Sequence, residues 1–139
     1  LLQELNFPKF KFRFKNSENK ISIFDVIRKR FMILQPEEWV RQHCVHYLIE
    51  VNGIPKSLIN VEKEITVNGL KKRYDIVVFN SDGSIYMIVE CKAPKIARYN
   101  LTLKADYLMV TNGISHYYCQ MDFENECYNF LKDIPEYKK

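Results

Sequence analysis

The chain has 139 residues, of which 47% are apolar and 14% aromatic, and its formal net charge is +4 at pH 7. These values are typical of one globular domain with one core and exclude a disordered chain. The mildly basic balance permits an anionic partner without requiring one. The chain has no apolar run of about 18 residues, and its first residues lack the features of a signal peptide, so we expect no membrane association.

Four scattered cysteines, Cys44, Cys91, Cys119 and Cys127, contain no closely spaced pair. This spacing predicts reduced, buried thiols in a cytoplasmic protein rather than a disulfide framework or a zinc site.

The N-terminal part alternates aromatic and basic residues from Lys9 to Phe14. The alternation predicts a half-buried strand, which turns at residues 16–19 and returns as a hairpin partner from Ile21 to Phe24. We expect the aromatic side chains to pack in the core. A stacking platform for single-stranded nucleic acid is the alternative.

A helix is predicted from Pro36, because proline suits the first helical position and Glu37 and Glu38 suit the first turn. Apolar residues at helical spacing continue to Val51, and Asn52-Gly53 ends the helix. A second short helix is predicted over 97–105. Strands are predicted over 57–67, 73–79, 85–91, 107–111, 115–121 and 128–131.

This order predicts an α/β or α+β fold with a mixed central sheet flanked by helices. We expect a single domain over residues 1–139. It would comprise an N-terminal strand or hairpin extension over 1–34, a core over 35–121 and a C-terminal edge segment over 122–139.

The central hairpin, RYDIVVFNSDGSIYMIVECKAP, carries charged residues in an apolar setting. Asp75 lies in its first strand, and Glu90 and Lys92 share one face of the second. Folding the hairpin at Ser81-Asp82 places Asp75 opposite Ile88 and one diagonal step from Glu90. Charges in such strands are costly unless they are paired or bound to something.

Two close carboxylates disfavour joint ionisation, so the hairpin predicts a cation between Asp75 and Glu90. Mg²⁺ takes oxygen ligands, and the backbone carbonyl of Cys91 could add one. Lys92 could orient or deprotonate a water, or steady the charge that develops on a phosphate, which would make a phosphodiester hydrolysis site. A structural ion-pair cluster is the alternative.

Asp75 followed by Glu90-Cys91-Lys92 resembles the PD-(D/E)xK nuclease motif, with Tyr74 in place of its proline. More closely, the chain is similar to the N-terminal nuclease domain of the restriction subunit of type I restriction–modification enzymes, above all to small stand-alone bacterial proteins with that domain. The resemblance runs roughly from Ile21 to Met121 through the motifs PEEWVRQ, KRYDIVVF, VECKAP, ARYN and TNG.

The resemblance implies a restriction-endonuclease-like fold and Mg²⁺-dependent DNA cleavage, with Mn²⁺ as a substitute. Asp75 and Glu90 would bind the metal, and Lys92 would assist the attacking water. The first helix would supply another acid. We prefer Glu37 to Glu38 because Glu37 lies on the core-facing stripe. The alternative is that both are merely first-turn acids favoured by the helix dipole.

The same resemblance assigns Tyr99 to a Gln-x-x-x-Tyr element, whose Gln is replaced here by Lys95. In the family a longer segment separates the VECKAP and ARYN motifs. We therefore expect additional residues between Lys95 and Ile96 in the complete sequence. A true deletion there would remove a supporting element and make activity doubtful.

Several other residues have two interpretations. Lys72 and Arg73 could contact phosphates or simply be a solvated strand end. Arg41, which shares the PEEWVRQ motif with Gln42, could pair with an acid or touch DNA. The histidines, His43, His46 and His116, are expected to be structural.

Two functions therefore compete. One is a Mg²⁺-dependent DNA endonuclease, and the other is an inactive module that keeps the fold and binds nucleic acid or protein. DNA is the expected partner, and a homodimer is compatible with either function. The chain contains no Walker motif, so we expect no ATP-driven translocation by it.

Overall fold

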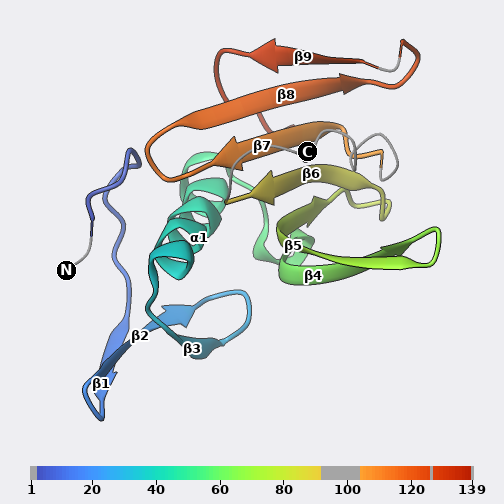
Figure 1. The fold of residues 1–139 in the computed structure, drawn as a ribbon. Helices are drawn as coiled ribbons and strands as arrows, with labels where there is room; N and C mark the ends of the chain where they lie inside the picture. Colours follow the sequence, from blue (N-terminus) through green and yellow to red (C-terminus); the bar gives the residue numbers. More distant parts are fainter. Residues whose placement is uncertain (1–2, 92–103, 126, 139) are drawn as a thin grey trace.

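The computed structural model describes residues 3–91, 104–125 and 127–138 (Figure 1). These residues form one three-stranded sheet, one six-stranded sheet and one α-helix. The predicted α+β class with a mixed sheet is thereby confirmed. Within the described residues, no helix is long and apolar enough to cross a membrane.

The small N-terminal sheet has the order β1-β2-β3 and is antiparallel. Its strands are β1 (Phe14–Ser17), β2 (Lys20–Asp25) and β3 (Arg30–Ile33). The turn and the returning strand agree with the prediction, whereas the strand predicted over Lys9 to Phe14 is wrong, since β1 begins only at Phe14.

The segment before β1 lies along the helix rather than in a sheet. The ring of Phe12 lies 4.9 Å from that of His43 and 4.6 Å from that of His46, and Phe10 contacts the same two rings. Packing on the helix thus replaces strand pairing for these aromatic residues. Phe14, in β1, remains half exposed.

Helix α1 (Pro36–His46) begins at the predicted proline and continues through a π-helical turn, Tyr47–Val51, before the chain leaves at Asn52. A short 3₁₀ turn, Lys56–Leu58, leads into the large sheet. Cys44 and Leu48, both on the predicted apolar stripe, are fully buried.

The large sheet has the order β4-β5-β6-β7-β8-β9, and only its β6–β7 pair is parallel. The strands agree with the predicted ones to within about three residues at each end. They are β4 (Ile59–Val67), β5 (Leu70–Phe79), β6 (Ile85–Glu90), β7 (Tyr107–Thr111), β8 (His116–Asp122) and β9 (Cys127–Leu131). The helix predicted over 97–105 falls largely outside the described residues.

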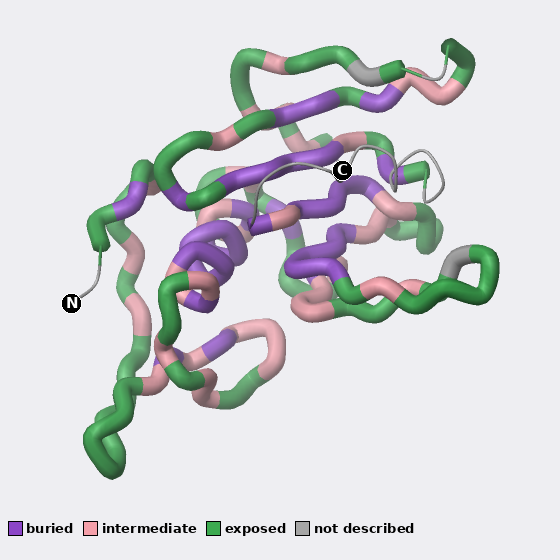
Figure 2. The backbone as a smooth tube through the Cα atoms, viewed as in Figure 1, coloured by how far each residue is buried: buried purple, intermediate pink, exposed green. Residues whose placement is uncertain are grey.

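The core lies on both faces of this sheet, and α1 covers one of them (Figures 1 and 2). On the α1 face, Ile76 and Val89 pack with the helix stripe, while Val77 and Ile88 join a second cluster on the opposite face. The cysteines are free thiols, as predicted. Cys127 is exposed on the edge strand β9, which corrects the expectation that all four are buried.

Candidate functional site

The register of the central hairpin differs from the predicted one. Val77 pairs with Ile88, and Ile76 pairs with Val89. Continuing this register places Asp75 beside Glu90, so the predicted position of Asp75 opposite Ile88 is wrong by two residues. The carboxylates are thus closer than a diagonal pair would be.

The local chemistry of the turn explains this shift. Asp82 accepts hydrogen bonds from the backbone and the hydroxyl of Ser84, and Gly83 has a φ of 90°, which favours glycine. The turn is therefore centred later than Ser81-Asp82. The ladder also has a bulge between Val78 and Phe79, which shifts the pairing once more.

Asp75 and Glu90 interlock where β5 and β6 separate. The Asp75 backbone N–H donates to Glu90 Oε1 at 3.1 Å, and the Cys91 N–H donates to Asp75 Oδ2 at 2.8 Å. Carboxylate oxygens thus replace the carbonyls that would continue the strand ladder. Asp75 is only 8% exposed, so its position is fixed by these contacts.

Glu90 has an unusual affinity for protons. Burial is the main cause that raises the pKa of Glu90 to about 7, and the negative charge of Asp75 acts in the same direction. The hydrogen bond from the Asp75 backbone N–H and the positive charge of Lys72 lower this pKa. Near neutral pH this carboxyl is therefore divided between its neutral and charged forms. A cation bound beside it would favour the charged form.

Arg41 of α1 is the buried counter-ion of this site. Its Nη2 atom donates to Glu62 Oε1 at 2.8 Å, to Asp75 Oδ1 at 3.0 Å and to Glu37 Oε1 at 3.1 Å. Burial opposes the charge of Arg41, yet the bond to Asp75 and the surrounding acids raise the pKa of its guanidinium above the usual value. Of the two predicted alternatives, Arg41 thus adopts the pairing with acids.

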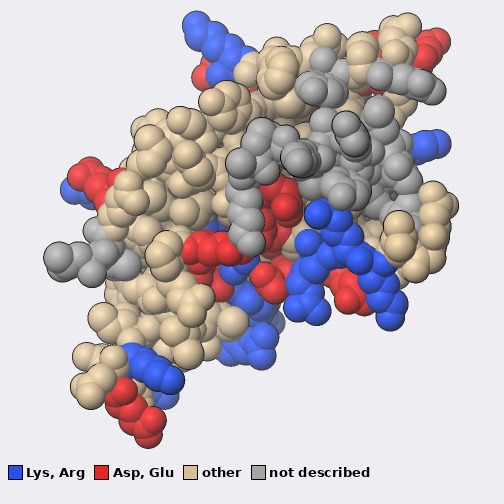
Figure 3. Space-filling view, in the orientation of Figure 1, with Lys and Arg blue, Asp and Glu red and all other residues tan. Residues whose placement is uncertain are grey.

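Three carboxylates share that single guanidinium nitrogen. Glu37, Glu62 and Asp75 each offer an oxygen, and these oxygens lie within 4.8 Å of one another. Figure 3 shows acidic side chains gathered near the centre of this face, with Lys and Arg side chains beside them. Arg73 lies 3.6 Å from Glu62 as well, and oxygen donors grouped this closely are the type of ligand that a divalent cation binds.

Glu62 is a member of this cluster that the sequence did not indicate. It has a left-handed φ of 56° in the middle of β4, between the pairs Val61↔Ile76 and Lys63↔Tyr74. This conformation costs a residue with a side chain about 1–2 kcal/mol. It persists here while the Glu62 carboxylate bonds to Arg41.

The apolar residues of both strands change faces at this point. Ile76 packs on the α1 face, but Tyr74, two residues away, packs on the opposite face. Val61 and Ile65 of β4 change faces in the same way. Regular alternation in the sequence conceals the change, so no signal in the residues would have identified Glu62.

Glu38 belongs to a second, structural network. It accepts hydrogen bonds from Arg28 Nη2 at 2.8 Å, from Arg41 Nη1 at 2.7 Å and from Gln42 Nε2 at 2.8 Å. Arg28 also donates to the buried Asp25 at 2.6 Å. This chain of contacts connects the N-terminal hairpin to Arg41. Glu37, rather than Glu38, is therefore the helix acid grouped with Asp75. Its predicted core-facing position is wrong, however, because its side chain is 39% exposed and Glu38 is the buried one.

The remaining predicted residues are dispersed. Arg73 Nη1 lies 3.6 Å from Glu62 Oε2, and Lys72 Nζ lies 5.6 Å from the ring centre of Tyr74. Lys92 and Tyr99 lie outside the described residues. The sequence passes directly from Lys95 to Ile96, so the expectation of additional residues between them is wrong.

The histidines make local contacts of the structural kind. His43 Nδ1 lies 2.8 Å from the Trp39 carbonyl, and His46 Nδ1 lies 2.8 Å from Glu50. His116 lies between the Thr111 hydroxyl and the carbonyl of Asn6.

The acidic residues of the site thus lie where the central hairpin of a mixed α+β fold ends. A family model described as the type I restriction enzyme R protein N terminus matches residues 36–135. The match covers well over half of the chain, which therefore belongs to that family. It begins at the first residue of α1 and leaves out the N-terminal hairpin. No curated protein matches the chain.

Proposed function

We propose that this chain is a Mg²⁺-dependent DNA endonuclease domain of the PD-(D/E)xK type that hydrolyses phosphodiester bonds. The observation that carries the proposal is the hydrogen-bonded pair of Asp75 and Glu90. Glu90 is followed two residues later by Lys92. Membership of the restriction-enzyme family supports a restriction-related role. A cytoplasmic location and a homodimer stay predictions.

The residues present fit Mg²⁺ because they offer oxygen donors. Asp75 and Glu90 would hold the ion, together with the Cys91 carbonyl, and Glu37 stands close enough to Asp75 to contribute. When bound, Mg²⁺ supplies a Lewis acid for the phosphate and lowers the pKa of a coordinated water.

The protein's own residues would prepare this chemistry. Arg41 and the Cys91 N–H hold the Asp75 carboxylate in one orientation, so little reorganisation is needed. Glu90 can release its proton near neutral pH because its pKa is about 7. In the proposal Lys92, which the resemblance assigns as the catalytic lysine, orients the attacking water and stabilises negative charge on the phosphate.

The test is cleavage of supercoiled, linear duplex and single-stranded DNA with Mg²⁺ or Mn²⁺. We expect cleavage of at least one duplex form, and its loss when EDTA removes the metal. Failure of the folded protein to cleave any form with either metal would contradict the proposal.

An inactive binding module is the second candidate, and two observations favour it. Lys95 replaces the expected Gln, and the chain has no longer segment before the ARYN motif. In addition, Arg41 already pairs with Glu37, Glu62 and Asp75. Stabilisation of the protein by millimolar Mg²⁺ distinguishes the two candidates, since only a metal site predicts it.

A further inference from the structure

Strands β4 and β5 extend beyond the rest of the large sheet as a two-stranded ribbon. Their pairing continues to Val67↔Leu70, whereas the pairing of β5 with β6 ends at Ile76↔Val89. At about 3.4 Å per residue, β5 runs roughly 20 Å past its last pair with β6. Asn68 and Gly69, both with positive φ, close the ribbon in a tight turn (Figure 1).

This segment is rich in basic residues. Residues 63–73, here called the basic ribbon, contain Lys63, Lys71, Lys72 and Arg73 but only one acid, Glu64. Their net charge is therefore +3, against +4 for all 139 residues. Lys63, Lys71 and Arg73 are exposed, and Figure 3 shows Lys and Arg side chains clustered beside the acidic group.

The basic ribbon is connected directly to the carboxylate cluster. Arg73 has a side chain that is 61% exposed, and its Nη1 atom lies 3.6 Å from Glu62 Oε2. Lys71 shares a face with Arg73. Counted along β5, Arg73 stands about 7 Å and Lys71 about 14 Å from Asp75. At about 3.4 Å per base pair, these cations would lie roughly two to four base pairs from a phosphate held at Asp75.

We propose that the basic ribbon is the arm that binds the phosphate backbone of double-stranded DNA beside the carboxylate cluster. This inference rests on the proposed function and adds the surface that holds the substrate. Lysines on an edge strand also discourage aggregation, but that role does not account for three consecutive cations on β5 next to the acids.

Double-stranded DNA suits the basic ribbon better than a single strand does. Single-strand binding relies on exposed aromatic rings on which bases stack. The aromatic residue at the base of the ribbon, Tyr74, is buried in the core. A two-stranded ribbon also has the width that the major groove of DNA admits.

The test compares two double variants of equal charge in a binding assay with a short labelled DNA duplex in EDTA. The first variant, Lys71→Gln with Arg73→Gln, removes the two exposed cations that share one face of the basic ribbon. The control, Lys20→Gln with Lys132→Gln, removes the same charge from exposed sites elsewhere. The ribbon variant should bind about 10-fold more weakly, and the slope of log affinity against log salt should fall by about 2. The control should stay near wild type, and melting curves verify that both variants fold.

Equal weakening by both variants would overturn the proposal, because net charge alone would then explain binding. Unchanged binding by the ribbon variant, or tighter ribbon-dependent binding of single-stranded DNA, would overturn it as well. Binding in EDTA is independent of cleavage. A protein that binds through the ribbon but never cleaves DNA would therefore refute the proposed endonuclease while the ribbon assignment stands. If the wild type cleaves DNA and the ribbon variant binds DNA as tightly as the wild type, the ribbon assignment is refuted while the proposed endonuclease stands.

Discussion

Arg41 Nη2 donates to Asp75 Oδ1 over 3.0 Å and so joins helix α1 to the central strand of the large sheet. The same nitrogen contacts Glu37 and Glu62, which approach Asp75 from the helix and from β4. Arg41 therefore acts as a resident counter-ion that keeps the carboxylates assembled. A bound divalent cation would share these oxygens with it.

Replacing Arg41 by Met should destabilise the fold strongly. The variant removes the arginine that pairs with the buried Asp75 and one of the two that pair with the buried Glu38, and breaking a buried pair in this way costs about 3–5 kcal/mol. Urea unfolding measures this change. Lys20→Met, at an exposed site, is the control and should change stability by less than about 0.5 kcal/mol. An equal response of the two variants would show that the network of Arg41 contributes nothing.

Removing the carboxylate of Glu38 should mainly lower the stability of the fold, whereas removing that of Glu37 should mainly weaken Mg²⁺ binding. Glu38→Ala should cost about 3 kcal/mol or more, because its carboxylate is 8% exposed and pairs with Arg28 and Arg41. Glu37→Ala should cost less than about 1 kcal/mol, because that side chain is 39% exposed, but it should weaken Mg²⁺ binding. Urea unfolding and calorimetric Mg²⁺ titration measure the two effects. A larger loss of stability from Glu37→Ala would reverse the assignment.

Glu90 should make the stability of the metal-free protein fall as the pH rises from about 4.5 to about 7. Its pKa is raised from 4.5 to about 7, so in this range the folded state binds more protons than the unfolded one. Its contribution is fully present below pH 4.5 and is lost above pH 7. Glu90→Gln should remove this dependence and make the metal-free protein more stable than the wild type at pH 8. The free energy of unfolding of each protein is measured at pH 4 and at pH 8. An equal difference between the two pH values for the wild type and for Glu90→Gln would contradict this account.

Mg²⁺ should raise the melting temperature of the wild type, and more so at pH 8 than at pH 6. Binding requires the ionised form of Glu90, whose pKa is about 7, so protons compete with the metal at the lower pH. At a concentration of 100 times its dissociation constant, the ion stabilises the fold by about 2.7 kcal/mol. Asp75→Asn should abolish the shift at both pH values. A shift that the variant retains would place the metal elsewhere.

Much of the fold follows from local patterns in the sequence. The helix start at Pro36 and the helix end at Asn52-Gly53 each depend on residues that act on the backbone locally, and both predictions are confirmed. The strand predicted over Lys9 to Phe14 failed because its aromatic side chains pack on α1, a tertiary contact that an alternating pattern does not encode.

The site was predictable only in part for the same reason. Asp75 and Glu90 stand out as acids in apolar strands, so their meeting could be inferred, but the register depended on a bulge that sequence spacing does not reveal. Glu62 looks like an ordinary solvent-facing residue until its left-handed backbone turns it toward Arg41. Likewise, the acids that pair with Arg41 come from three separate elements, α1, β4 and β5.

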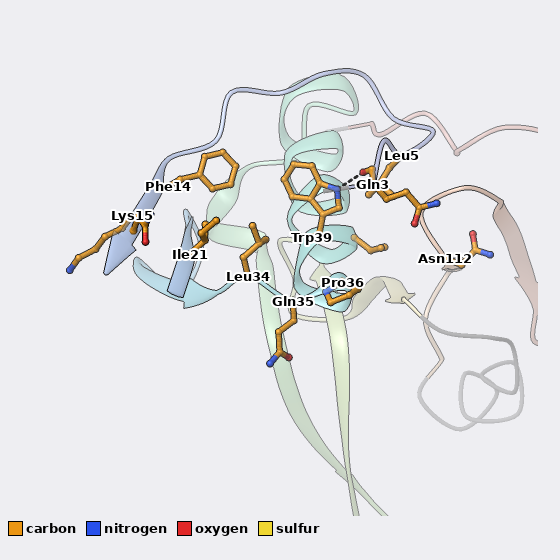
Figure 4. Close-up of a pocket in the computed structure, with 12 residues that line it drawn as sticks. Gln3, Leu5, Phe14, Lys15, Ile21, Leu34, Gln35, Pro36, Trp39 and Asn112 are labelled. Carbon is orange, nitrogen blue, oxygen red and sulfur yellow. Dashed lines mark hydrogen bonds between the residues drawn. The ribbon is translucent and has the colours of Figure 1, made fainter. Parts of the chain in front are cut away.

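A groove of about 1000 Å³ lies between the N-terminal hairpin and α1 and is lined mainly by apolar side chains such as Phe14, Ile21 and Trp39 (Figure 4). It contains none of the carboxylates that Arg41 contacts. The carboxylate cluster and this groove are therefore separate places on the molecule.

The most direct test of the central claim is DNA cleavage by Lys92→Ala beside the wild type, in Mg²⁺ and in Mn²⁺. The account predicts that the wild type cleaves duplex DNA and that the variant does not, while the variant keeps the wild-type melting temperature and its stabilisation by metal. Cleavage by the variant at the wild-type rate would contradict the assignment of this hairpin as a nuclease site.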